Sequence, residues 1–186
     1  MKIIETLKEK QIQLLAQLTG NIEPEDIEKG TTTENLRERL LLTADSMAWD
    51  DKQIALALHL ECEPDELSEE RYDHYGMTIF SLGSQEYSVG TDDEADSAWD
   101  QELDSYIEGC IEPELEKVAV GNLAAYIKFD SEMWKRDARM DGRGHTLSRY
   151  DGEEIELEGN LYAYRRNWFA SLSPLSSREG SKGRNP

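Results

Sequence analysis

Apolar positions recur with the period of an α-helix through the first 70 residues of the chain. They mark a first helix that ends at Gly20, and Thr33 or a neighbouring threonine is placed to cap a later helix that continues through Leu41. The stretch 49–67 adds a further apolar helix and a break at Pro64. The pattern therefore predicts an N-terminal helical region over residues 1–70.

The pattern changes to short β-strands in the second part of the chain. Two strands are expected at about 77–82 and 86–89, joined through Gly83 and Ser84. Further strands are expected at 153–158 and 161–166, the latter with clear alternation of its two faces. We expect an α+β fold in which N-terminal helices and a small antiparallel sheet pack against an acidic amphipathic helix. An acidic α+β domain would then span residues 71–170, followed by a flexible polar tail over residues 171–186.

The acidic helix is predicted from residue 92 onward. Thr91 and Glu94 have the spacing of a capping box, and apolar side chains from Ala95 to Cys110 recur at three- and four-residue intervals. Pro113 is expected to interrupt the chain after this helix.

The opposite side of this helix carries an acid at every fourth residue. We call this row the acid ladder; it consists of Asp92, Asp96, Asp100, Asp104 and Glu108. Like charges at this spacing destabilise a helix by about 0.2–0.5 kcal/mol per pair, so the ladder costs on the order of 1–2 kcal/mol before screening by salt. The dipole of the helix favours acids only in the first turn, which leaves Asp104 and Glu108 unexplained.

Most of the negative charge lies in one segment. The chain of 186 residues has a formal net charge of −20, far beyond the magnitude of about 2–8 that keeps a small domain soluble. Residues 61–116 hold 19 acids and a single base, Arg71, a net of −18. Because strands are predicted within this segment, the acids are displayed on a folded scaffold and not on a disordered tail.

The sequence contains no recognisable motif for binding a metal ion or a phosphate group. The three histidines have no zinc-spaced partner, residues 137–148 depart from a calcium loop, and no phosphate-binding glycine motif occurs, so we expect no cofactor and no metal. No apolar run is long enough for a membrane span and the N-terminal residues lack the apolar region of a signal peptide, which favours a cytoplasmic protein. We expect Cys62 and Cys110 to be reduced.

The best enzymatic candidate is the segment DGRGH. His145 lies beside glycines and close to Arg143, Arg149 and Asp151, which are residue types that a general acid or base with an oxyanion clamp needs. The alternative is structural: the glycines supply turn geometry and the arginines pair with surplus carboxylates. We favour the structural reading.

Three pieces of the chain carry a family resemblance. The segments TDDEAD, RDARMDGRGH with the following YDGEE, and YAYRRN resemble a group of uncharacterised acidic proteins encoded by bacteriophages and prophages, over about residues 86–167. The resemblance transfers no catalytic residue. It implies a phage context, in which small acidic proteins of the bacterial host's cytoplasm often inhibit host defences.

These observations predict a non-enzymatic anti-defence inhibitor, anti-CRISPR or anti-restriction, that imitates nucleic acid. DNA places one phosphate per about 3.4 Å along each strand, and the acid ladder places one carboxylate per about 6 Å, with neighbouring acids beside it. The expected partner is a basic DNA- or RNA-binding bacterial defence protein, without direct binding of nucleic acid or membrane; the N-terminal helices would add contacts or a homodimer interface. The residues predicted to bind the partner are Asp92, Asp93, Asp96, Asp100, Asp104, Glu108, Glu66, Glu69, Glu70 and Asp73.

Two alternatives stay open at this point. One is a phage accessory protein that binds a basic host protein without imitating DNA. The other is a small enzyme that uses His145.

Overall fold

A computed structural model describes residues 2–20, 32–70, 74–118 and 129–166. Its helical elements are α1 (Ile3–Thr6), α2 (Glu9–Leu18), α4 (Thr33–Met47), α5 (Asp51–Leu60), η1 (Pro64–Glu66), α6 (Asp92–Tyr106), η2 (Ile107–Ile111), α7 (Glu112–Val118), α8 (Ser131–Arg139) and α9 (Arg143–Leu147). Its strands are β1 (Ser68–Glu69), β2 (Thr78–Leu82), β3 (Gln85–Thr91), β4 (Ile155–Leu157) and β5 (Leu161–Arg166).

The strands form one antiparallel sheet in the order β1-β2-β3-β5-β4, and the predicted α+β class is confirmed. The β2–β3 hairpin turns at Gly83, whose φ of +61° favours glycine. Strand β5 has the bounds that the sequence predicts, whereas β4 covers only the middle of the predicted 153–158 strand.

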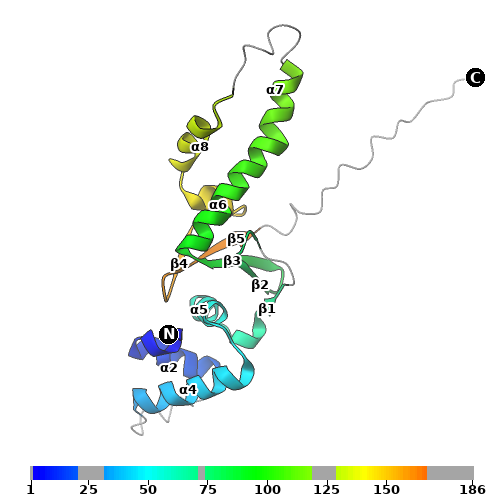
Figure 1. Ribbon diagram of the computed structural model, residues 1–186. Helices are drawn as coiled ribbons and strands as arrows, with labels where there is room; N and C mark the ends of the chain where they lie inside the picture. The colour runs from blue at the N-terminus through cyan, green and yellow to red at the C-terminus, as the bar shows by residue number, and fades with distance from the viewer. Residues whose placement is uncertain (1, 21–31, 71–73, 119–128, 167–186) are drawn as a thin grey trace, which may run out of the picture.

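The N-terminal helices cover one face of the sheet and share a hydrophobic core with it (Figure 1). Helix α5 lies against this face, and its buried Ile54 and Leu56 belong to the same core as Phe80 and Val89 of the sheet. The predicted boundary at residue 70 falls directly after β1. Because β1 pairs with β2, the part of the chain before this boundary contributes the edge strand of the sheet. The predicted tail, residues 171–186, lies outside the described residues.

The acidic helix covers the opposite face of the sheet. Ala95 and Ala98 of α6 pack with Leu147 of α9 and with Tyr164 of β5 in a second, smaller core. The alternation predicted for β5 is therefore confirmed, since Leu161 and Ala163 belong to the first core and Tyr164 to the second. The sheet is the middle layer between two layers of helices.

Three predicted boundaries were wrong. The first helix is divided into α1 and α2, because Leu7 is buried and Lys8 caps α2 with its N–H bonded to Gln11 Oε1 at 2.7 Å. Pro113 does not interrupt the chain: α6, η2 and α7 form one continuous rod (Figure 1), and Pro113 lies in the first turn of α7, directly after a π-helical segment. Within the DGRGH segment, where turn geometry was expected throughout, only Asp141 and Gly142 form the turn, and Arg143 begins the short helix α9.

Candidate functional site

The helix that carries the acid ladder begins as predicted. The Thr91 hydroxyl accepts a hydrogen bond from the Glu94 N–H at 3.3 Å, and Glu94 Oε2 accepts one from the Thr91 N–H at 2.7 Å. This capping box is confirmed, and it fixes the start of α6 directly after β3.

The first four members of the acid ladder each form an ion pair within the protein. Their partners are three bases at four-residue spacing, which we call the base ladder: Lys135 and Arg139 on α8 and Arg143 at the start of α9. Lys135 contacts Asp104 and Arg139 contacts Asp100. The two ladders run antiparallel, and the three bases pair with four of the five acids.

Arg143 makes the most extensive of these contacts. Its Nη1 donates to Asp92 Oδ1 at 2.7 Å and to Asp96 Oδ1 at 3.0 Å, and its Nε donates to Glu154 Oε2 at 2.8 Å. Its side chain is 12% exposed and lies 4.7 Å from the ring centroid of Tyr162. Although burial disfavours the charge, hydrogen bonds to Glu154 and Asp92 raise the pKa of Arg143.

Another carboxylate of α6, that of Glu102, is less exposed to solvent than the carboxylates of the acid ladder. Glu102 contacts Arg149 and lies 3.7 Å from Nε2 of the buried His74, which has no hydrogen-bond partner at that atom among the described residues. Contact with His74, and then with Arg149, lowers the pKa of Glu102 to about 2 against the opposing effect of burial. Glu102 is therefore a structural ion within the fold.

These contacts favour the structural reading of the DGRGH segment. Arg143, Arg149 and Asp151 are all engaged, the last with the Ser148 hydroxyl at 2.6 Å and with Arg165 at 3.3 Å. Neither arginine is left without a carboxylate partner to clamp a reacting oxyanion beside His145. The His145 side chain itself is exposed.

A different group of acids has no basic partner in the described ranges. We call it the acidic edge, since it follows the end of α5, η1 and the outermost strand β1; its members are Glu61, Glu63, Asp65, Glu66, Glu69 and Glu70. No ion pair links any of them to a basic side chain in the part of the chain that the structure describes. Three of them accept hydrogen bonds: Asp65 from the Trp49 indole, Glu66 from the Glu63 N–H at 3.2 Å, and Glu70 from the Ser81 hydroxyl at 2.7 Å.

The predicted partner-binding residues thus divide into two sets. Asp92, Asp96, Asp100 and Asp104 are paired internally, although 53–64% of each side chain stays exposed. Glu66, Glu69, Glu70, Asp93 and Glu108 lack a basic partner among the described residues, and Asp73 lies outside them. Glu66 lies in η1, Glu69 on β1 at the edge of the sheet and Glu70 directly after it. The acid ladder lies on a different element, α6, which covers the face of the sheet opposite the N-terminal helices (Figure 1).

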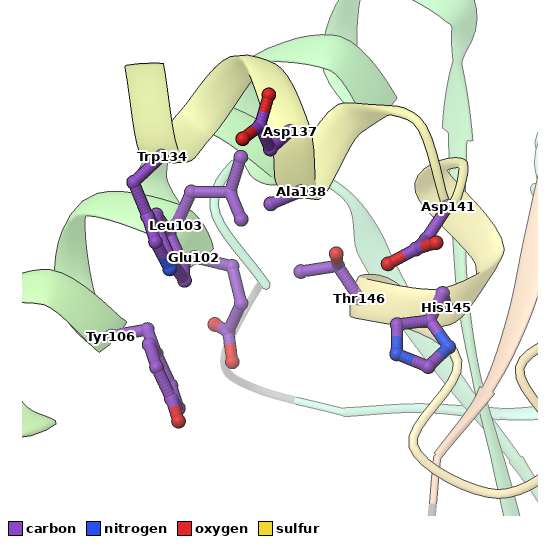
Figure 2. Close-up of a pocket in the computed structure, with 9 residues that line it drawn as sticks. All are labelled: Glu102, Leu103, Tyr106, Trp134, Asp137, Ala138, Asp141, His145 and Thr146. Carbon is purple, nitrogen blue, oxygen red and sulfur yellow. The ribbon is translucent and has the colours of Figure 1, made fainter. Parts of the chain in front are cut away.

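A cleft of about 570 Å³ lies between α6 and the α8–α9 segment (Figure 2). The rings of Tyr106 and Trp134 stack at one end, with centroids 5.6 Å apart and planes 4° from parallel. Asp141 and His145 lie at the other end. The remaining lining residues are Glu102, Leu103, Asp137, Ala138 and Thr146.

Metal and disulfide chemistry find no support in the described ranges. No group of three histidine, cysteine or acidic side chains there is arranged to hold a metal ion. Cys62 and Cys110 are free thiols. Within the same ranges, no helix has the length and apolar character that crossing a bilayer requires.

Sequence reasoning missed the base ladder. Its signal was present, because Lys135, Arg139 and Arg143 repeat at the same four-residue interval as the acids of α6. Interpreting the DGRGH segment as a loop hid the third member. The cleft was also missed, since its walls come from segments that are about 30 residues apart.

The chain shows no significant similarity to any protein-family model, to any curated protein or to any solved structure.

Proposed function

We propose that this protein is a non-enzymatic inhibitor that binds, through its acidic edge, the basic nucleic-acid-binding surface of a bacterial defence protein in the host cytoplasm. The single observation that carries the proposal is the contrast between the two acidic groups. The acid ladder is matched by bases of the same chain, whereas the acidic edge has no basic partner among the described residues.

Unmatched charge of one sign destabilises a folded protein through self-repulsion. The chain places Lys135, Arg139, Arg143 and Arg149 on α8, α9 and the following turn, against α6. It leaves the acidic edge without such partners among the described residues. A basic partner surface would relieve the repulsion on binding. It would also be steered toward the edge, with an association rate that falls as salt rises.

The surface that would imitate nucleic acid is therefore the acidic edge and not the acid ladder. Reversing the charges of ladder residues would break internal ion pairs and would confuse loss of binding with loss of structure. The edge offers cleaner positions, because Glu61 and Glu69 are exposed and their side chains make no hydrogen bond or ion pair within the described residues.

A structural role for the edge is the competing reading. Acidic side chains on an outermost strand such as β1 discourage pairing with another sheet. Under that reading, charge reversal would promote self-association but would not affect capture of a basic protein.

The test compares the double variant Glu61→Lys/Glu69→Lys with a matched control, Glu5→Lys/Glu38→Lys, which changes two exposed acids on α1 and α4. The immobilised proteins are incubated with bacterial lysate at low and high salt, and captured proteins are challenged with duplex DNA. We expect the native chain and the control to capture a nucleic-acid-binding protein that DNA or salt displaces, and the edge variant to lose it.

Capture that survives in a folded edge variant would refute the proposed surface. Capture that duplex DNA cannot displace would identify an accessory binder that does not compete with nucleic acid.

A further inference from the structure

The side of α8 that faces away from α6 is open to solvent. The base ladder turns one side of α8 toward the acids of α6. Four residues on the other side have the three-, four- and seven-residue spacing of one helix face, and we call them the outer face: Met133, Arg136, Asp137 and Met140. Met133 is 52% exposed, Met140 is 83% exposed, and the side chains of Arg136 and Asp137 are 74% and 64% exposed. Figure 2 shows the Asp137 carboxylate turned away from Asp141 and from the stacked rings.

This arrangement inverts the usual orientation of a surface helix. A helix at the surface of a folded protein normally turns its apolar side toward the core and its charged side toward water. In α8 the charged side contacts the protein through Lys135 and Arg139. Met133 and Met140 lie in solvent, and no residue of the helix is buried. Because methionine adapts its shape to irregular apolar surfaces and gains from burial against them, the outer face has the character of a contact surface.

The outer face is complementary to itself. When two copies of α8 lie side by side in opposite directions, with a two-fold axis between positions 136 and 137, Met133 of one copy faces Met140 of the other. Arg136 of one copy then faces Asp137 of the other, and the symmetry repeats both pairs. Within one chain Arg136 Nε and Asp137 Oδ1 are 3.6 Å apart, and both side chains stay exposed enough to meet a second partner. Two apolar pairs would thus flank two ion pairs.

The charge of α8 permits this approach, although the chain as a whole is acidic. Two chains with a net charge of −20 repel each other. Helix α8, in contrast, contains three bases and two acids, so its own charge does not oppose a second copy of an acidic protein. A second copy is therefore the occupant that fits both the charge and the symmetry of the outer face.

We propose that two copies of this protein associate through the outer faces of their α8 helices, with the helices antiparallel. This surface differs from the acidic edge, so the inference does not depend on the proposed function. Because a helix of nine residues is about 14 Å long, the contact is small. Interfaces of this size associate weakly, and the dimer forms only at high protein concentration.

Sedimentation equilibrium of the full chain tests the association, in about 0.15 M NaCl to screen the overall repulsion and at up to about 1 mM protein. We expect a monomer–dimer equilibrium. Arg136→Asp should weaken it at least about tenfold, because each Asp137 then faces a like charge. The exchange Arg136→Asp/Asp137→Arg places opposite charges across the axis again and should restore the dimer.

Two controls separate the outer face from general effects of charge and of apolar exposure. Lys117→Asp makes the same change of net charge at an exposed base of α7 and should leave the association nearly unchanged. Met140→Ser should weaken the dimer at least about tenfold, because it removes apolar surface from both ends of the contact. Leu42→Ser removes a side chain that is 71% exposed on α4 and should have no such effect.

Cross-linking tests the antiparallel register. In a Cys110→Ser background, the double variant Met133→Cys/Met140→Cys should form a covalent dimer on mild oxidation, because each introduced thiol faces its counterpart in the other copy. Within one chain the two positions are about 10.5 Å apart along the helix, beyond the reach of a disulfide. Each single variant should stay largely monomeric, since its two copies lie on opposite sides of the axis.

A native chain that is monomeric at all concentrations would overturn the proposal, as would equal weakening by Arg136→Asp and Lys117→Asp. Loss of the dimer in Leu42→Ser, with the dimer kept in Met140→Ser, would overturn it by placing the contact on the N-terminal helices. Single cysteine variants that cross-link as fast as the double variant would refute the antiparallel arrangement.

Discussion

Nη1 of Arg143 lies 3.0 Å from Oδ1 of Asp96, although 47 positions separate the two residues in the chain. The same nitrogen contacts Asp92, and the pairs of Arg139 with Asp100 and of Lys135 with Asp104 continue the row. An acid at every fourth residue is thus explained by a base at every fourth residue on the neighbouring helices. The repulsion within α6, on the order of 1–2 kcal/mol, is offset by these contacts.

Arg143→Gln should destabilise the protein by about 2–4 kcal/mol, because it leaves Asp92, Asp96 and Glu154 close together without the cation that separates them. The free energy of unfolding in urea measures the loss. Arg136→Gln is the matched control, since the Arg136 side chain is 74% exposed and its one ion pair among the described residues is with its neighbour Asp137. The control should change stability by less than about 0.5 kcal/mol. Equal effects of the two substitutions would show that Arg143 does not organise the ladder.

Glu102 should make the stability of the protein sensitive to acid. Its pKa is about 2 in the folded protein against an ordinary value of 4.5. Between these values the unfolded chain binds a proton that the folded protein does not, so stability is present above pH 4.5 and is lost as the pH falls toward 2. The loss from this residue is on the order of 3 kcal/mol.

Denaturant unfolding of the native chain and of Glu102→Gln across this pH range measures the effect of Glu102. The two proteins should differ most at neutral pH and converge near pH 2. A difference that does not depend on pH would contradict the assigned role.

Salt should loosen α8 without unfolding the core. Helix α8 contains no buried residue, and its described contacts with α6 are ion pairs, the Arg139 guanidinium over the Trp99 ring and the Tyr106–Trp134 stack. Exposed ion pairs are screened at high ionic strength, whereas buried apolar contacts are not weakened. Hydrogen exchange of the α8 amides should therefore accelerate in about 1 M NaCl, while the β3 and β5 amides stay protected. Uniform acceleration in both regions would argue against a separately released helix.

Gly144→Ala should destabilise the docking of α9. A Cβ atom at this position would lie 2.6 Å from the Gly152 carbonyl oxygen and 2.8 Å from the backbone of Glu153, and backbone cannot move aside as a flexible side chain can. We expect a loss of about 1–3 kcal/mol in thermal or urea unfolding. Gly109→Ala is the control, because a methyl group added there would meet no described atom within 4 Å and should cause no such loss. An unchanged stability of Gly144→Ala would contradict this expectation and would show that the backbone of residues 152–154 shifts to accommodate the methyl group.

Elements with strong local signals were predicted from the sequence. The Thr91–Glu94 capping box, the β2–β3 hairpin and the alternation of β5 all depend on contacts between near neighbours, which the spacing of residue types records directly. The helix cap at Thr32 also falls within the predicted set, since Thr32 is the neighbour of Thr33 and accepts from the Asn35 N–H at 3.3 Å.

Contacts between distant segments were not predicted. The charge count placed the surplus acids correctly but did not reveal which of them would meet bases, because Lys135 and Arg139 approach α6 only after the chain has reversed direction. The same limit applies to Glu102, whose pattern is that of an exposed acid but whose side chain is 15% exposed. The proline rule failed at Pro113 because a π-helical segment precedes it.

The pairing of the two charge rows also restricts how α8 can be placed along α6. A shift of α8 by one helical turn, about 5.4 Å, toward Glu108 would give Lys135 and Arg139 new acidic partners, so the charges of α8 alone do not exclude it. Arg143 opposes such a shift, because its side chain is held at the same time by Asp92 and Asp96 of α6 and by Glu154. The position of α8, which contains no buried residue, is therefore anchored where the chain leaves it, at the three carboxylates around Arg143.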